Sequence, residues 1–120
     1  MGASGRITTH VLDISHGKPA SGMIVRLWKR ESGSTTLELL KEDRINSDGR
    51  LDAPLLEGKN MATGEYELSF DMGSYFKEVR DMESLLFEII PIRFRVADEN
   101  SHYHVPLLVA PGGYSTYRGS

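Results

Sequence analysis

The sequence predicts an all-β protein, a β-sandwich of seven to eight short strands with one short helix. Three observations lead to this prediction. Hydrophobic residues alternate with polar ones in several short runs, polar turn residues separate the runs at regular intervals, and a single segment has helical spacing. The 120 residues are 39% hydrophobic and 26% charged, which suits one globular domain of ordinary size.

The first half of the chain contains three short strand candidates, residues 7–12, 23–29 and 36–40. The second is the clearest, because Met23, Val25 and Leu27 share one parity while Arg26 and Trp28 take the other. Residues 15–19, 32–34, 46–49 and 57–60 are rich in Gly, Asn, Pro and Ser, which favour turns. We therefore expect strands joined by tight connections in this half.

Residues 65–71 give the strongest strand pattern, with Tyr66, Leu68 and Phe70 on one face and acids and a serine on the other. The segment that follows differs. Over residues 74–82 the hydrophobic side chains fall at near-helical spacing, and Gly73-Ser74 offers a helix start. The spacing predicts one short helix there.

Three more strand candidates complete the chain, at residues 90–96, 102–108 and 114–117. The first alternates regularly. Its Pro91 must lie at the start of the strand, on an edge strand or at a bulge, because proline has no N–H to donate to a neighbouring strand. Residues 111–113, Pro-Gly-Gly, form a turn between the last two. Seven to eight strands with one helix are typical of a sandwich.

The amino-acid composition limits the classes of partner that we expect and the cellular compartment that we expect. The formal charge is −3, from 14 basic and 17 acidic residues, and argues against nucleic acid or an anionic membrane as partner. The absence of cysteine excludes disulfides and thiolate chemistry. No apolar run reaches the roughly 20 residues needed to cross a membrane, and no signal-peptide core is present. With no peroxisomal tail either, we expect a cytoplasmic protein.

Histidines are the first candidates for chemistry. His102 and His104 are two residues apart on a predicted strand, which places both rings on one face roughly 7 Å apart. The pair could begin a zinc site with His10 as a third ligand, or one ring could act as a general base. For His10 alone a hydrogen-bonded structural role is the commoner interpretation, and His16 lies in a polar turn where solvation is expected.

Arg50 and the last residues are further candidates. Arg50 follows the turn Asn46-Ser47-Asp48-Gly49 and is either an exposed turn arginine or a forked cation for a planar, oxygen-rich ligand. The final residues, Tyr114-Ser115-Thr116-Tyr117-Arg118-Gly119-Ser120, hold two tyrosines and a cation where most chains fray. We expect this segment to be ordered and to take part in the function of the protein. No Gly-x-Ser-x-Gly elbow or His-Glu-x-x-His motif is present.

Three motifs together resemble the transthyretin-like family. They are Thr9-His10-Val11-Leu12-Asp13, then Asp48-Gly49-Arg50, and His102-Tyr103-His104-Val105-Pro106-Leu107-Leu108 leading into Tyr117-Arg118-Gly119-Ser120. The closing Tyr-Arg-Gly-Ser is the most specific element, and it favours the family's 5-hydroxyisourate-hydrolysing branch over the hormone-carrier branch. The likeness covers residues 7 to 120, which we expect to be the hydrolase domain, with residues 1–6 a flexible N-terminus.

The resemblance implies a transthyretin-like (prealbumin-like) β-sandwich, assembled as a homotetramer, a dimer of dimers with sites in a channel between dimers. It also implies hydrolysis of 5-hydroxyisourate in urate and purine degradation, without metal or cofactor. Carried over by position, the catalytic residues are His10, Arg50, His104 and Ser120, and the substrate-binding residues are His10, Arg50 and Tyr117. A non-catalytic carrier of small ligands is the alternative. The sequence leaves open how His10 and His104 divide the catalytic steps. It also leaves open whether Ser120 acts through its hydroxyl or its carboxylate.

Overall fold

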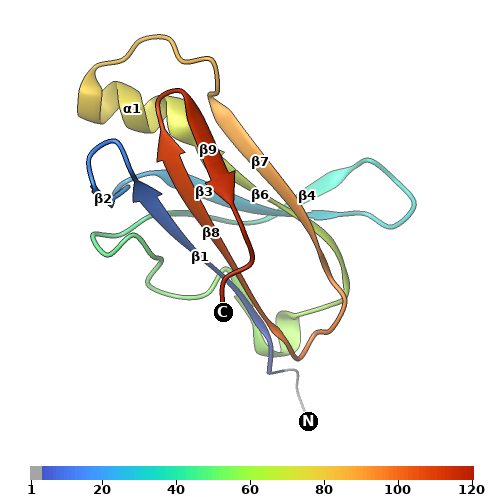
Figure 1. The fold of residues 1–120 in the computed structure, drawn as a ribbon. Helices are drawn as coiled ribbons and strands as arrows, with labels where there is room; N and C mark the ends of the chain where they lie inside the picture. The colour runs from blue at the N-terminus through green and yellow to red at the C-terminus, as the bar shows by residue number, and fades with distance from the viewer. Residues whose placement is uncertain (1–3) are drawn as a thin grey trace.

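The computed structural model of the protein describes residues 4–120, which fold into two β-sheets packed face to face with one α-helix at an end of the sandwich (Figure 1). The described residues contain seven strands of four to nine residues, two strands of two residues, one short 3₁₀-helix and α1. In chain order they are β1 (Arg6–Asp13), β2 (Lys18–Pro19), β3 (Ile24–Arg30), β4 (Leu37–Arg44), β5 (Leu56–Glu57), η1 (Gly58–Asn60), β6 (Gly64–Asp71), α1 (Met72–Arg80), β7 (Ile89–Val96), β8 (His102–Ala110) and β9 (Gly113–Thr116).

One sheet has the strand order β2-β1-β8-β9, with β5 also paired to β1, and the other has the order β4-β3-β6-β7. Nearly all pairs are antiparallel, but β1 and β8 run parallel over eight residue pairs, from Arg6 opposite His102 to Asp13 opposite Val109. This pairing joins strands that are far apart in sequence. It lies at the centre of its sheet, with β9 at the edge (Figure 1).

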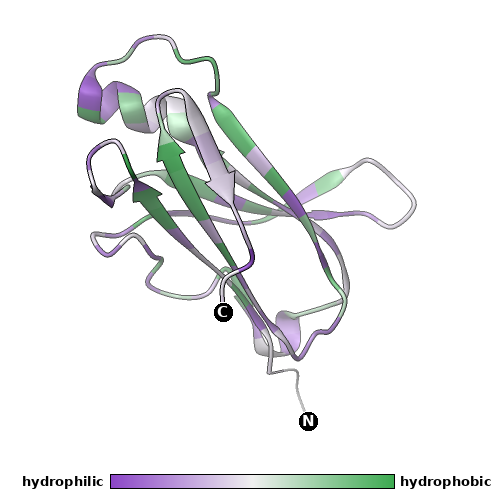
Figure 2. Ribbon diagram, in the orientation of Figure 1, coloured by the Kyte–Doolittle hydropathy of each residue, from purple (hydrophilic) through white to green (hydrophobic). Residues whose placement is uncertain are grey.

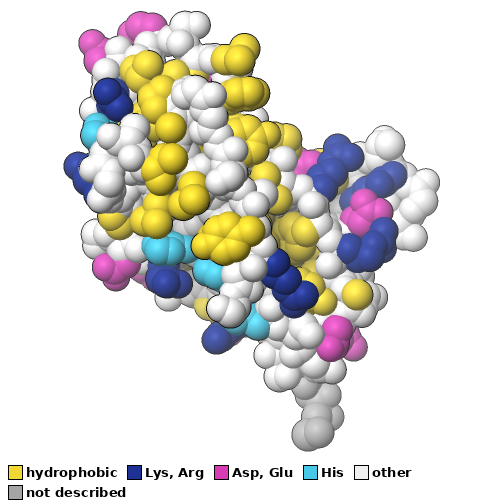
Figure 3. Space-filling model, viewed as in Figure 1, with side chains coloured by type: hydrophobic (Ala, Val, Ile, Leu, Met, Phe, Trp, Pro, Cys, Tyr) yellow, Lys and Arg dark blue, Asp and Glu magenta, His cyan; other side chains and the backbone are white. Residues whose placement is uncertain are grey.

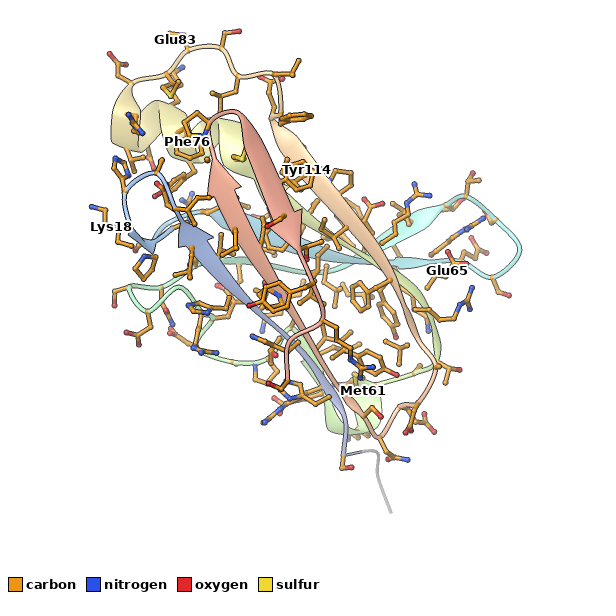
Figure 4. The ribbon with its side chains drawn as sticks, in the orientation of Figure 1. Lys18, Met61, Glu65, Phe76, Glu83 and Tyr114 are labelled. Carbon is orange, nitrogen blue, oxygen red and sulfur yellow. The ribbon has the colours of Figure 1, made fainter. Side chains whose placement is uncertain are left out.

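The core fills the space between the sheets and follows the alternation expected from the sequence. Tyr66, Leu68 and Phe70 of β6 are buried there, as are Val25 and Leu27 of β3. Figure 2 shows the hydrophobic residues concentrated on the strands, and Figure 4 shows side chains filling the layer from Phe76 of α1 to Met61 beside η1. On the outer face of the other sheet, Thr8 and His10 of β1 are only half-buried and are available for other roles, whereas Glu67 and Ser69 on the outer face of β6 are buried.

The predicted sandwich with a single α-helix is confirmed, with small shifts in the element bounds. The helix begins two residues before the predicted start, because the Asp71 side chain accepts a hydrogen bond from the Ser74 N–H and caps it. It ends before Asp81, which has φ 54° in the left-handed region. Strand β4 is longer than expected, reaching Arg44 through a charged stretch with weak alternation. The two-residue strands β2 and β5 were not predicted.

Of the predicted flexible N-terminus, residues 1–3 lie outside the described residues. Ser4 and Gly5 hydrogen-bond to the loop before β8, at Asn100 and Glu99, and Arg6 begins β1. The division into residues 1–6 and 7–120 stays a prediction. Within the described residues, no helix is both long and apolar enough to cross a membrane.

Asp13, at the end of β1, is a fully buried carboxylate that ties this strand to α1. It accepts hydrogen bonds from the Tyr75 hydroxyl at 2.8 Å and from the Ser15 hydroxyl and N–H at 2.5 and 3.0 Å, and His16 Nδ1 lies 2.8 Å from it. Burial alone would raise the pKa of Asp13, but the bonds from Ser15, Tyr75 and His16 outweigh it and hold that pKa below its ordinary value.

We expect Tyr75→Phe to lower the free energy of unfolding at neutral pH by about 1–3 kcal/mol, because a buried carboxylate loses a donor. A depressed pKa stabilises the fold above the unfolded-state pKa, and that stabilisation is lost as pH falls through the folded pKa. The difference between Tyr75→Phe and wild type should therefore shrink below about pH 4. Urea unfolding across the pH range measures it, with Tyr114→Phe, at an exposed tyrosine, as control. A difference that does not change with pH would contradict this role for Asp13.

Candidate active site

A pocket of about 500 Å³ lies on the outer face of the β1–β8 sheet. In Figure 3, histidine side chains gather in the lower half of the viewed face together with arginine or lysine, below a region of hydrophobic side chains. The pocket draws on β1, β8, the loop after the Asn46–Arg50 turn, and the chain after β9. Its lining residues are Arg6, Thr8, Thr9, His10, Arg50, Leu51, Asp52, Ala53, Pro54, His102, His104, Pro106, Tyr117, Gly119 and Ser120.

The alternation of β1 and β8 places the polar groups on this face. Along β1 the buried residues Ile7 and Val11 point into the core, so Thr8 and His10 point outward and are half-buried. The parallel register then sets Thr8 opposite His104. Residues nearly a hundred positions apart thereby share one surface.

Thr8 is the centre of a short hydrogen-bonded chain. Its hydroxyl lies 2.7 Å from Nε2 of His102 and 2.8 Å from Nδ1 of His104. The two imidazole rings are 6.0 Å apart, centre to centre, close to the distance expected for two strand residues on one face. Because Nδ1 of His104 is engaged by Thr8, Nε2 is the nitrogen left for a bound molecule.

The Asn46–Arg50 turn docks against His10. Gly49 has φ 83°, and its carbonyl accepts a hydrogen bond from the Val11 N–H at 2.8 Å. A Cβ at position 49 would lie 2.8 Å from His10 Cδ2, closer than side chains approach. Glycine is required there both for the backbone conformation and for the approach to the imidazole. Because the turn packs against His10, Arg50 lies beside this histidine in the pocket.

The chain after β9 turns back across β8, as Figure 1 shows, and is held at two points. The Gly119 N–H donates to the His104 carbonyl at 2.8 Å. The Arg118 guanidinium donates to the His102 carbonyl at 3.2 Å and stacks over the Tyr103 ring at 4.7 Å. These contacts carry Tyr117 and Ser120 to the rim of the pocket.

Gly119 allows the tail to lie against the His104 ring. A Cβ at that position would clash with His104 Cδ2 and come within 3.2 Å of Pro106 Cγ. The glycine of the Tyr-Arg-Gly-Ser segment is therefore explained by close packing.

Burial and neighbouring cations keep the pocket histidines neutral. Burial lowers the pKa of His104, and Arg50, His102 and His10 lower it further. The pKa of His10 is lowered by burial and by Arg50, against an opposing effect of the Asp48 carbonyl. Neutral imidazoles at neutral pH can accept protons, as a general base must.

The five residues predicted for the site, His10, Arg50, His104, Tyr117 and Ser120, all line this one pocket. Their roles stay predictions. Thr8 was not among the candidates, and His102 was a candidate that the predicted catalytic set left out. The parallel register that brings them together has no signal in the sequence alone.

The other histidine candidates also have defined surroundings. Among residues 4–120, no three or more His, Cys, Asp or Glu side chains are grouped so that they could hold a metal ion. His102 and His104, suggested as a metal pair, both bond to Thr8. His16 lies outside the pocket and bonds to Asp13.

We predict that Gly119→Ala displaces the tail or the His104 ring while changing the free energy of unfolding by less than about 1 kcal/mol, because the tail adds little to the core. The ring resonances of His104 in NMR spectra should shift clearly. Gly112→Ala is the matched control, since a Cβ there meets nothing within 4 Å. Unchanged His104 resonances in Gly119→Ala would refute the packing explanation.

Comparisons with known proteins agree with this geometry. The HIUase/Transthyretin family model matches residues 7–119. The chain is 55% identical to a 5-hydroxyisourate hydrolase of Halalkalibacterium halodurans over 98% of its length and 99% of that protein's. It is 50% identical to 5-hydroxyisourate hydrolase 2 of Rhizobium meliloti over the full length of both.

Solved structures give the same result. The 5-hydroxyisourate hydrolase of Klebsiella pneumoniae superimposes with a TM-score of 0.78 at 36% identity, covering 100% of this chain and 97% of that one. An (S)-allantoin synthase gives 0.87 at 43% identity, and the match covers 98% of this chain but 44% of that one. The sandwich, the matched residues and these identities lead to one conclusion: the chain belongs to the HIUase/Transthyretin family.

Proposed function

We propose that the protein hydrolyses 5-hydroxyisourate, opening its ring to give 2-oxo-4-hydroxy-4-carboxy-5-ureidoimidazoline. The observation that carries this proposal is one pocket holding His10, Arg50, His104 and the tail. The chain that forms it is 55% and 50% identical to two hydrolases of this substrate over nearly their whole length. A carrier of apolar ligands needs few such polar groups, so the pocket chemistry favours the enzyme.

His104 is the proposed general base. Its Nε2 deprotonates a water molecule as that water attacks the ring carbonyl of the substrate. The depressed pKa of His104, set by burial and then by Arg50, keeps the ring able to accept this proton at neutral pH. A positioned base of this kind contributes about 10²–10⁴-fold to the rate.

Arg50 is the proposed electrostatic partner. The carbonyl oxygen gains negative charge as the carbon becomes tetrahedral, and a guanidinium beside it stabilises that charge most where water is excluded. The fork of Arg50 also suits a planar ring that carries several oxygens. His10 lies against the same turn and is proposed to orient the substrate and share in the proton transfer.

Tyr117 and Ser120 are proposed to bind and orient the substrate from the tail side. Tyr117 is 58% exposed in the single chain, which leaves its ring free to pack on a ligand. The contacts of Arg118 and Gly119 with β8 support this role, since they hold the tail over the His104 backbone.

We predict that His104→Asn and Arg50→Glu each lower kcat/KM by at least about 10²-fold while the protein stays folded. The assay forms 5-hydroxyisourate from urate with urate oxidase and follows its absorbance by stopped flow, with and without the protein. His16→Asn is the matched control, because this histidine lies outside the pocket. Near-wild-type turnover in either pocket variant would refute the assignment, and wild-type protein without effect would favour the carrier.

We also propose a homotetramer, a dimer of dimers in the cytoplasm. Among the described strands, β7 pairs only with β6 and β9 only with β8, so each sheet ends on an open edge near the Phe87–Tyr114 contact. Apolar side chains are exposed nearby on the β7 side, at Leu86, Phe87 and Ile89.

Analytical ultracentrifugation at micromolar concentration tests the assembly. The expected mass is four times the 13.4 kDa of the single chain. Tyr114→Glu, which sets a charge in the exposed apolar contact with Phe87, should shift the distribution toward smaller species. A wild-type protein that sediments as a monomer would contradict the tetramer.

A further inference from the structure

The hydroxyl of Thr8 is shared between two imidazole rings. It lies 2.7 Å from Nε2 of His102 and 2.8 Å from Nδ1 of His104. A hydroxyl has one hydrogen to donate, so when both rings are neutral it donates to one nitrogen and accepts from the other. The protonation of the two rings is thereby linked.

Two arrangements satisfy this chain. In the first, the Nδ1–H of His104 donates to Thr8, Thr8 donates to Nε2 of His102, and Nε2 of His104 carries a lone pair toward the pocket. In the second every proton is shifted, and Nε2 of His104 carries the hydrogen. Only the first makes His104 a base on the pocket side.

We propose that Thr8 is a positioning residue: its hydroxyl, with His102 as partner, holds the tautomer of His104 whose Nε2 is the base, and passes the accepted proton outward to His102. The proposal rests on the hydrolytic function proposed above. It adds two residues to that site, Thr8 and His102, which act through His104 and need not touch the substrate.

The proton movement balances at each step. Nε2 of His104 takes a proton from water, and the hydroxide adds to the carbonyl. The Nδ1 proton of His104 moves to Thr8, the Thr8 proton moves to Nε2 of His102, and His102 releases its Nδ1 proton to solvent. His104 is then neutral with hydrogen on Nε2, ready to protonate the leaving ring nitrogen. As His104 gives up that proton, the shift runs in reverse: His102 takes a proton from solvent at Nδ1, its Nε2 proton returns to Thr8, and the Thr8 proton returns to Nδ1 of His104. The first arrangement is then restored.

The charges around the two rings favour such a transfer. His104 faces Arg50, His10 and His102, so an imidazolium there would sit among cationic or basic groups. The chain moves the proton away from Arg50. His102 faces Arg6 and Arg118, which also disfavour a lasting positive charge, but it is only half-buried and can release the proton to water.

The next residue, Thr9, makes a different kind of hydrogen bond from that of Thr8. Thr9 points into the core, and its hydroxyl donates to the Val105 carbonyl at 2.7 Å, a structural bond to backbone. The Thr8 hydroxyl instead bonds two side chains, both of which line the pocket. Its position follows from the β1–β8 register, with Thr8 opposite His104.

The test compares Thr8→Val, which keeps the shape and removes the hydroxyl, with Thr8→Ser, which restores the hydroxyl. We expect kcat to fall on the order of tenfold or more in Thr8→Val with KM changed less, and Thr8→Ser to recover most of it. Ring ¹⁵N shifts should place His104 in the Nδ1–H form in wild type and Thr8→Ser, and move it toward the Nε2–H form in Thr8→Val. Thr116→Val is the matched control, since this hydroxyl bonds the Pro106 carbonyl rather than an imidazole.

Each possible result either supports or overturns the proposed role of Thr8. Wild-type kcat or an unchanged His104 tautomer in Thr8→Val would overturn the proposal, as would a Thr8→Ser variant no faster than Thr8→Val. A loss in Thr116→Val equal to that in Thr8→Val would overturn it too, because the effect would then belong to the sheet. The tautomer comparison needs no turnover, so it still decides the role of Thr8 if the wild-type protein fails to act on 5-hydroxyisourate.

Discussion

Parallel pairing of β1 with β8 is the constraint on which the pocket depends. It sets Thr8 opposite His104 and carries His102 and His10 on the same outward face, although the two strands lie almost a chain length apart in sequence. Inward residues of the same strands, Ile7 and Leu107, are fully buried in the core. Because side chains alternate with period two, a slip of one residue would bury the imidazoles and expose the core. Packing of the core therefore also fixes the geometry of the site.

Two glycines bring the other parts of the site to this surface. Gly49 lets the turn before Arg50 approach His10, and Gly119 lets the tail lie on His104. At both positions any larger residue would meet the imidazole. The segments they belong to are short. Backbone groups of Gly49 and Gly119 bond to β1 and β8, and the Arg118 side chain adds one bond to β8. The histidines are thus held between the sheet below and two close-packed loops above.

Much of this could be predicted from the sequence because it depends on local pattern. Alternation predicted β6 and β7, and turn residues predicted the connections. The resemblance to the transthyretin-like family, carried by short local motifs, predicted His10, Arg50, His104 and the tail as site residues. Long-range pairing has no local signal, which is why the contact of Thr8 with two histidines was not foreseen. The hydrogen bond from Tyr75 to buried Asp13 was missed for the same reason, since it joins α1 to β1. The charged second half of β4 lacks alternation, so its extent could not be predicted either.

The central claim is that the tail completes a site built on the β1–β8 surface without being needed for the fold. Deleting residues Tyr117 to Ser120 and measuring both turnover of 5-hydroxyisourate and the melting temperature tests it most directly. The tail is largely exposed and contacts β8 through few hydrogen bonds, so the melting temperature should change little. Turnover should fall to the spontaneous rate of decay. A truncated protein that hydrolyses the substrate at the wild-type rate would contradict the account.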